Sequence, residues 1–253
     1  MTELALDTAS GRLSARLTPW DERVLGFATA EITGIEASSS VAALDLLLQV
    51  EDWASAHRVR YLFGRVDARH RLLRAALLHA DFQFVETSLA ISRSGMGGLP
   101  LVPRGMLPTL RPAAAADIPL LRQIADDDFT HGRFLEDPAI DEAHARLRTA
   151  NWIEDLVNAG LAHVAESRSR VIGFHAELLH PSEQRAELLL TGAAAPYAML
   201  AMPLWVIALE SLAARDIRRC TTLVSAANTG ILNLYARLGF QFNSTLAGFR
   251  KFL

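Results

Sequence analysis

The chain has 253 residues, of which 51% are hydrophobic and 21% are charged, and its formal net charge is −3. This composition is ordinary for a globular protein. Because there is no basic excess, the charge argues against nucleic-acid binding and against an anionic membrane surface. The single cysteine, Cys220, excludes an internal disulfide and a cysteine metal cluster, and we expect it to be a small core residue of a strand.

The start of the chain lacks the basic and apolar regions of a signal peptide, so we expect a cytoplasmic protein. Residues 188–209 contain no charged residue and are long enough to span a bilayer. However, Gly192, Pro196 and Pro203 interrupt this run. We therefore expect a strand, a tight loop and a buried helix here, with no membrane partner.

Glycine and proline are most frequent between the two halves of the chain, where residues 94–108 contain four glycines and three prolines. Such a stretch is typical of a linker or a long loop. The sequence therefore predicts an N-terminal part over 1–93, a linker over 94–108 and a C-terminal part over 109–253.

Apolar spacing and turn residues predict the elements in chain order. In the N-terminal part we expect a helix over 41–57. In the C-terminal part we expect helices over 117–129, with Asp117 as a possible N-cap, over 143–160, ending at Gly160, and over 203–215 and 226–240. The expected strands are 109–113, a hairpin of 161–166 with 170–179, 185–192, 218–224, and a closing pair within 240–253. Strands alternating with helices predict an α/β (α+β) fold with a mixed sheet.

The end of the C-terminal part is repeated in the N-terminal part. Shifted by 158 positions, residues 66–87 align without a gap on 224–245, and the helix at 41–57 falls over the helix at 203–215. An internal repeat indicates a repeated structural unit, so we expect a duplicated half-domain. The identical positions are Val66, Ala68, Phe82, Gln83, Phe84 and Thr87, which match Val224, Ala226, Phe240, Gln241, Phe242 and Thr245. His70, Leu77 and Asp81 stand where the second copy has Asn228, Tyr235 and Gly239.

The order of elements over 109–253, together with the stretch AANTGILNLYARLGF, resembles the GNAT superfamily of acyl-CoA-dependent acyltransferases. The fourth main helix of that family carries the pattern N-x-x-A-x-x-x-Y-x-x-x-G-F. Asn228, Tyr235 and Gly239-Phe240 occupy the matching positions, with Ile231 in place of alanine. The resemblance implies a GNAT fold, with a twisted sheet flanked by helices, preceded by a partial GNAT-like half-domain.

A narrower resemblance is to nucleotide-sugar amine acetyltransferases of the TDP-fucosamine acetyltransferase type. Residues 17–27, LTPWDERVLGF, are similar to the opening W-D-[ST]-x-x-F-G-[FV] of those proteins. Residues 132–153 are similar to their S-R-F-x-x-D-P…Y-x-x-W-I segment, although Thr149 replaces the tyrosine. The resemblance makes Arg133, Phe134 and Trp152 candidate substrate-binding residues.

Acyl transfer from a thioester requires deprotonation of an amine, stabilisation of an oxyanion and protonation of the leaving thiolate. The resemblance implies that Tyr235 is the general acid that protonates the sulfur of CoA. A phenol is protonated at neutral pH and suits that role, but the spacing also fits a core tyrosine. Asn228 is either an N-cap or, by the resemblance, a ligand of the cofactor's pantetheine arm or phosphate region.

The resemblance also makes Glu187 the candidate general base. If it were buried among leucines, its pKa would rise; the alternative is a solvent-facing residue at the start of a strand, and Glu177 is the rival base. The backbone of Leu190, Thr191 and Gly192 is expected to bind the pantetheine arm. His175 is a candidate for the substrate pocket, although a structural role is the alternative. The histidines lack metal-ligand spacing, so no metal is expected.

The family's phosphate-binding signature, [RQ]-x-x-G-x-[GA], is missing. Pro196, Met199 and Ala201 stand at its three defining positions, and methionine in place of glycine would crowd the phosphates. Met199, Leu200 and Ala201 remain the candidate phosphate contacts by position. The nearby acidic run 126–129 is either a charged helix end or a contact for an amine substrate.

Three hypotheses follow. The first is an N-acyltransferase that uses acetyl-CoA or another acyl-CoA and a small-molecule amine, such as a nucleotide-linked amino sugar. The second is a degenerate, non-catalytic GNAT module that binds a ligand or a partner. The third is an acyltransferase with a bulkier acyl-CoA or another thioester as donor. An exposed half-domain edge would favour a homodimer.

Overall fold

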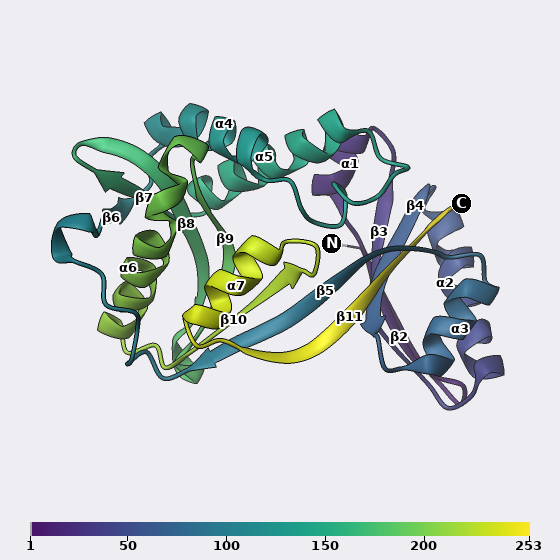
Figure 1. Ribbon diagram of the computed structural model, residues 1–253. Helices are drawn as coiled ribbons and strands as arrows, with labels where there is room; N and C mark the ends of the chain where they lie inside the picture. The colour runs from purple at the N-terminus through teal and green to yellow at the C-terminus, as the bar shows by residue number, and fades with distance from the viewer. Residues whose placement is uncertain (1) are drawn as a thin grey trace. The chain divides into compact units, whose positions relative to one another are not determined.

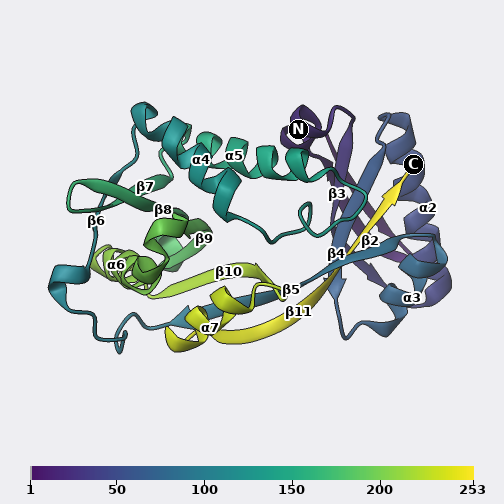
Figure 2. The same ribbon diagram turned by 45° about the horizontal axis from the view of Figure 1, so that its top comes forward.

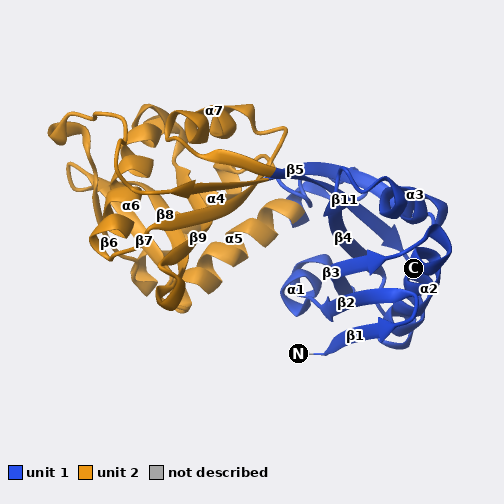
Figure 3. Cartoon of the chain, turned by 90° about the horizontal axis from the view of Figure 1, so that it is seen from below, with its two compact units in different colours: residues 1–89, 132–144, 244–253 blue, residues 90–131, 145–243 orange. Residues whose placement is uncertain are grey.

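The computed structural model describes residues 2–253, and it shows the expected mixture of strands and helices (Figure 1). The chain divides into two compact units (Figure 3). Unit 1 comprises residues 1–89, 132–144 and 244–253, and unit 2 comprises residues 90–131 and 145–243. This division differs from the one expected from the sequence, because 94–108 lies within unit 2 and two segments of the C-terminal part join unit 1.

Unit 1 is built on strands in the order β1-β2-β3-β4-β11. Strands β3 and β4 run parallel, whereas the other neighbours are antiparallel. The elements are β1 (Glu3–Thr8), β2 (Gly11–Leu17), α1 (Pro19–Leu25), β3 (Thr29–Ala37), α2 (Ser40–Ala56), β4 (Tyr61–Asp67) and α3 (Arg71–His79), with parts of β5 (Gln83–Ser94) and β11 (Gln241–Phe252).

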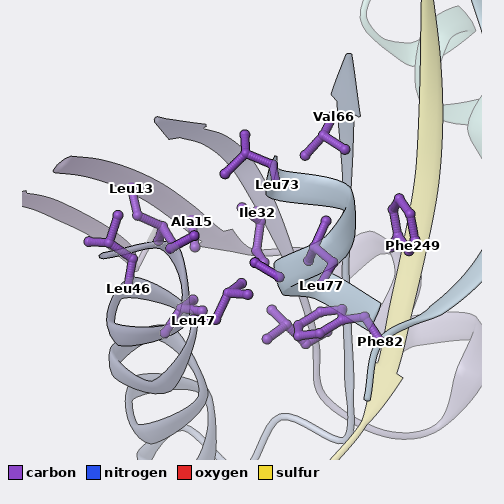
Figure 4. Close-up of a cluster of buried hydrophobic side chains, with 14 of the residues drawn as sticks. Leu13, Ala15, Ile32, Leu46, Leu47, Val66, Leu73, Leu77, Phe82 and Phe249 are labelled. Atoms are coloured by element: carbon purple, nitrogen blue, oxygen red, sulfur yellow. The ribbon is translucent and has the colours of Figure 1, made fainter. Parts of the chain in front are cut away.

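The core of unit 1 lies between this sheet and the helices α2 and α3 (Figure 4). Leu46 and Leu47 of α2 and Leu77 of α3 point toward Leu13 and Ile32 of the strands, and all are at most 5% exposed. Burial of each such side chain contributes about 1.5–3 kcal/mol. The predicted helix over 41–57 is confirmed as α2, and the side chain of Ser39 caps it by accepting from the Ala42 N–H at 3.1 Å.

Unit 2 has strands in the order β5-β10-β9-β8-β7-β6. Its strands are β6 (Thr109–Pro112), β7 (Ala162–Ser167), β8 (Arg170–His180), β9 (Arg185–Ala193) and β10 (Arg219–Ser225), with the second part of β5. Its helices are α4 (Ile118–Asp128), most of α5 (Glu142–Asn158), α6 (Ala201–Ala214) and α7 (Thr229–Arg237). Four short 3₁₀ turns are η1 (Arg104–Met106), η2 (Ala115–Asp117), η3 (Pro181–Glu183) and η4 (Ala195–Leu200).

Helices α4 and α5 cover one face of strands β7, β8 and β9. Their buried side chains, among them Leu121, Ile124 and Ile153, form one cluster with Phe174 and Ala176 of β8 and with Leu190 of β9. Alternate residues of β8 must therefore point to the opposite face. Figure 2 shows α4 and α5 together above these strands and α6 below them.

The apolar run at 188–209 forms a strand, a loop and a buried helix, as predicted. By length and composition alone, Ala195–Ala214 could cross a membrane, but the core helix of a protein passes the same test. The backbone at Tyr197, inside η4, is non-helical, so the helical run is interrupted there. Helix α6 buries Leu204, Trp205 and Leu209. The observed structure is therefore that of the predicted core helix.

The internal repeat predicted from the sequence has a structural counterpart. The series α2-β4-α3-β5 in the first half corresponds to α6-β10-α7-β11 in the second. The side chains of His70 and Asn228 occupy the same N-cap position and accept from Leu73 N–H and Ile231 N–H. Asp81 and Gly239, just after the helices α3 and α7, share a positive φ of 62° and 76°.

The end of the chain corrects one prediction. Residues 241–252 form one long strand, β11, and not a closing pair of strands. Residues 246–252 pair with β4 and complete unit 1, while the last residues of β5 belong to unit 2 next to β10. Each unit is thus completed by the strand that follows the repeat helix of the other half.

Gly239 is required by the backbone at the end of α7. Its φ is +76°, and a Cβ there would lie 2.7 Å from Nη1 of Arg93. We expect Gly239→Ala to lower the free energy of unfolding by about 1–3 kcal/mol, because both the strained φ and the displaced guanidinium cost energy.

Gly230 is the matched control for this substitution. It lies within α7, and the atom nearest to an added Cβ would be Asn228 Oδ1, at 3.9 Å. Gly230→Ala should therefore raise stability by up to about 1 kcal/mol. Urea unfolding of both variants checks the pair, and equal effects of one sign would contradict the assignment.

Candidate active site

Strands β9 and β10 separate part-way along their length. Their parallel pairing covers only Arg185–Glu187 and Arg219–Thr221. Both strands continue beyond it, to Ala193 and Ser225, and the Thr222 hydroxyl donates to the Leu188 carbonyl at 2.9 Å one step further on. The edge of β9 over Leu190, Thr191 and Gly192 therefore has no strand partner in β10. An extended ligand could bind there only if the backbone groups of this edge are not already paired with another strand.

A β-bulge lies where the two strands separate. Ala176 of β8 pairs with Leu190 and Glu177 pairs with Leu188, so Leu189 has no partner in β8. Unit 1 has the same arrangement, since the pairing of β3 with β4 ends at Ile32–Gly64 and Thr33 is the bulged residue opposite β2. The duplication thus extends to the divergent strands, whereas Tyr235 has only Leu77 as its counterpart.

The bulge changes the face to which Glu187 points. A bulge adds one residue to one strand, so the alternation of side chains shifts there. Glu187 is paired with Leu178 and is exposed. Of the two alternatives for Glu187, the structure therefore shows the solvent-facing residue near the start of a strand, not the carboxylate buried among leucines. The side chain is open to solvent and can still accept a proton.

Tyr235 is buried in unit 2, with 4% of its surface exposed. Its ring makes edge contacts with Trp205, at 6.3 Å between centroids, and with Phe240, at 4.6 Å. Burial raises the pKa of Tyr235 to about 12, and the Trp205 indole and the Thr222 hydroxyl, which lie near the phenol, offset part of this rise. The phenol thus lies near Thr222, which follows the paired part of β10, and it is neutral at physiological pH.

Asn228 is the N-cap of α7, which is one of the two roles predicted for it. Its Oδ1 accepts from the Ile231 N–H at 3.1 Å. The side chain is only partly buried. Since Oδ1 is used for the cap, the amide NH₂ is the group that would be offered to a ligand.

The loop between β9 and α6 offers few backbone N–H groups to an anion. The Ala195 N–H donates to Asp128 Oδ2 at 3.2 Å, and the Tyr197 N–H donates to Ala194 O at 2.7 Å. Pro196 has no N–H to offer. The candidate residue Met199 is 82% exposed, Leu200 is the N-cap of α6, and Ala201 donates its N–H to Ala198 O. Asp128 also places a carboxylate beside the loop.

His175 belongs to a buried polar network on the α6 side of the sheet. Its Nδ1 lies 2.7 Å from Thr191 Oγ1 and its Nε2 lies 2.7 Å from Glu177 Oε2. Arg215, at the end of α6, forms an ion pair with Glu177. His175 and Glu177 are each 2% exposed. The sequence identified both residues separately, and their spacing of two on one strand was the available signal that they share a face.

Arg133 and Phe134 lie in unit 1, whereas Trp152 and His175 lie in unit 2. Arg133 is 3.9 Å from Asp21 and 3.7 Å from Glu31, and its guanidinium lies 3.6 Å from the centroid of the Phe63 ring. The two sequence segments that resemble nucleotide-sugar acetyltransferases therefore contact each other through Arg133 and Asp21. Trp152 is partly buried under Arg148, at 5.0 Å.

Asp137 and Asp128 make contacts that the sequence did not predict, although Asp137 matches the segment similar to nucleotide-sugar acetyltransferases and Asp128 belongs to the acidic run 126–129. Asp137 accepts from the Tyr61 hydroxyl at 2.8 Å inside unit 1, and Asp128 bonds the loop after β9. Within residues 2–253, the structure holds no cluster of three His, Cys, Asp or Glu side chains suited to a metal ion.

No family model and no curated protein matches this chain. Solved structures do match it along nearly its whole length. A GCN5-related N-acetyltransferase from Sphaerobacter thermophilus is 14% identical with a TM-score of 0.65, covering 98% of this chain and 82% of that one. The tandem GNAT protein of the clavulanic acid biosynthesis pathway is 14% identical with a TM-score of 0.62, covering 99% and 82%.

A third structure is the GCN5-related glucosamine N-acetyltransferase region of a fungal multi-domain β-N-acetylglucosaminidase. It is 12% identical with a TM-score of 0.63, and the match covers 95% of this chain and 31% of that larger chain. Together these likenesses show that this chain has the GNAT fold, as predicted.

Proposed function

We propose that this protein is an acyl-CoA-dependent N-acyltransferase that moves an acetyl or other acyl group to a small-molecule amine. The observation that carries the proposal is the divergence of β9 and β10 beside the bulge at Leu189, with Tyr235 near Thr222 at the point of divergence. The GNAT fold supports it, because the solved neighbours include N-acetyltransferases.

In this proposal the unpaired edge of β9, at Leu190, Thr191 and Gly192, holds the pantetheine arm by backbone hydrogen bonds. The amide NH₂ of Asn228 provides a further contact. The bound thioester supplies the acyl group to the amine nitrogen, so a C–N bond forms and a C–S bond breaks. Exposed Glu187 accepts the proton that the amine loses. Tyr235 gives a proton to the leaving sulfur and is reprotonated from solvent.

The acceptor we favour is an amino sugar, with a nucleotide-linked one as the specific case. The similarity of residues 17–27 and 132–153 to nucleotide-sugar amine acetyltransferases supports it, as does a neighbour that acts as a glucosamine N-acetyltransferase. Arg133, Phe134, Trp152 and His175 are the proposed substrate-binding residues. We also propose a cytoplasmic protein that forms a homodimer and has neither nucleic acid nor membrane as a partner.

The loop after β9 supports a different donor as the second candidate. Asp128 accepts from the Ala195 N–H, and its charge would repel a pyrophosphate held at this loop. A thioester that makes little use of this loop would be unaffected. The same features fit a degenerate GNAT module that binds a ligand or a partner without catalysis.

Titration calorimetry with CoA, acetyl-CoA and acetyl-pantetheine tests these alternatives. We expect one-to-one binding of acetyl-CoA in the micromolar range, because the strand contacts are independent of the loop. Asp128→Asn should tighten CoA binding several-fold and leave acetyl-pantetheine unchanged, since it removes about one unit of repulsive charge. Asp127→Asn, at the exposed neighbouring position, is the control. No heat with any of the three ligands at millimolar concentration would refute the acyltransferase proposal and favour the non-catalytic module.

A further inference from the structure

Thr191 is the least buried member of the network that it forms with His175 and Glu177. Thr191 is the register partner of His175 and is only partly buried, while His175 and Glu177 are sealed from solvent. It lies on the part of β9 that has no pairing with β10. A ligand bound along that edge would therefore lie close to the Thr191 hydroxyl, which is hydrogen-bonded to His175, and His175 is itself held by Glu177.

The charge of Glu177 determines which nitrogen of His175 carries a proton. Burial opposes ionisation of Glu177, but its contacts with His175 and Arg215 outweigh burial and lower its pKa. A carboxylate can only accept, so His175 Nε2 must carry a hydrogen and donate to it. In the neutral imidazole, Nδ1 then accepts, and the Thr191 hydroxyl must donate to it.

The other groups around this network leave that arrangement undisturbed at neutral pH. His163 of β7 pairs with His175 across the strands, and burial lowers its pKa, so it is neutral. Cys220 of β10 has a pKa raised by burial to about 12, so its thiol is neutral. The charges of Arg215 and Glu177 compensate each other.

We propose that the Thr191 hydroxyl accepts a hydrogen bond from an N–H group of the bound ligand, and that His175 and Glu177 are positioning residues that set its direction. Because its hydrogen is used in the bond to His175, the Thr191 oxygen presents only lone pairs to a ligand bound along the unpaired edge of β9. A hydrogen-bond donor in place of the Glu177 carboxylate would reverse this, because Nδ1–H would then donate to Thr191 and the hydroxyl would donate outward. This inference rests on the proposed function, in which the N–H belongs either to a pantetheine amide or to the acceptor amine.

Thr191→Val removes the hydroxyl at constant shape, and Thr191→Ser is the matched control that keeps it. Thr191→Val should weaken ligand binding about three- to tenfold, the range of one hydrogen bond, and Thr191→Ser should not. Calorimetry with CoA alone detects a contact with the pantetheine amide. The KM for the best amine of an acceptor screen detects a contact with the amine. Thermal unfolding of both variants confirms that they are folded.

Glu177→Gln separates this role from a purely structural one. The glutamine amide can donate to His175 Nε2, so Nδ1 would carry the hydrogen and would donate to the Thr191 hydroxyl. We expect Glu177→Gln to weaken ligand binding as Thr191→Val does, and to have no further effect in the Thr191→Val background. NMR of the His175 ring identifies which nitrogen carries the hydrogen.

The possible results are distinct. Wild-type protein that binds neither CoA nor acetyl-CoA overturns the proposed function and this inference with it. Wild-type protein that binds them, while Thr191→Val changes neither affinity nor KM, overturns this inference alone.

Discussion

Tyr235→Phe should reduce turnover by about 10²–10³-fold and leave the protein folded. General acid catalysis contributes about 10²–10⁴-fold, and in the proposed reaction only this hydroxyl protonates the leaving sulfur. Because burial raises the pKa of Tyr235 to about 12, the acid is present at every pH of a practical assay. The measurement is thiol release from acetyl-CoA in the presence of an amine, at saturating concentrations of both.

Tyr61→Phe is the matched control for this prediction. Tyr61 is also a buried tyrosine, but it belongs to unit 1 and donates to Asp137 at 2.8 Å. We expect Tyr61→Phe to lower the free energy of unfolding by about 1 kcal/mol, the value of one hydrogen bond, and to leave turnover unchanged. If Tyr235→Phe instead behaved like Tyr61→Phe, Tyr235 would be a core residue without a role in catalysis.

Local sequence signals predicted the helices of unit 2, helix α2 of unit 1 and the duplication, but not the short helix α1. The cap of α7 by Asn228 depends on residues three positions apart, and the same cap recurs at His70. The repeat was visible because it preserves Phe82, Gln83 and Phe84 at the start of β5 and the equivalent residues at the start of β11. Caps and turns are set by neighbours in the chain, so they can be read from a short stretch.

Features that depend on pairing between distant strands were not predictable in this way. The bulge at Leu189 changes the face on which Glu187 lies, and nothing in RAELLLTG marks it, because strict alternation was the only available rule. The pairing of β11 with β4 is another example. Its partner β4 lies far away in sequence, so a single long strand could not be distinguished from a closing pair.

The candidate site was predicted in part for the same reason. Tyr235 and Asn228 came from one helix whose motif is continuous. The link from Thr191 through His175 to Glu177 joins two strands, and the bond from Ala195 to Asp128 joins a loop to the end of α4. The acidic run at 126–129 was visible, but its contact with the loop after β9 depends on the fold.

Asp137→Ala should be the most destabilising of the substitutions discussed, lowering the free energy of unfolding by about 3–5 kcal/mol. The Asp137 side chain is fully buried in unit 1, where it accepts from the Tyr61 hydroxyl at 2.8 Å and pairs with Arg250 Nε at 3.2 Å. It also accepts from the Ala139 N–H at 2.9 Å. Alanine would leave a buried guanidinium and a buried hydroxyl without this partner.

A double-mutant cycle tests this explanation. Arg250→Met alone leaves the Asp137 carboxylate without its cation, and should also be strongly destabilising. The double variant Asp137→Ala with Arg250→Met should lose less than the sum of the two, because neither buried charge remains. Asp52→Ala, on the exposed face of α2, is the control and should change stability by less than about 0.5 kcal/mol. Denaturant unfolding measures the stability of all four variants. Strictly additive losses would show that Asp137 and Arg250 act independently. In that case packing around Phe134, and not this ion pair, holds the segment 132–144 in unit 1.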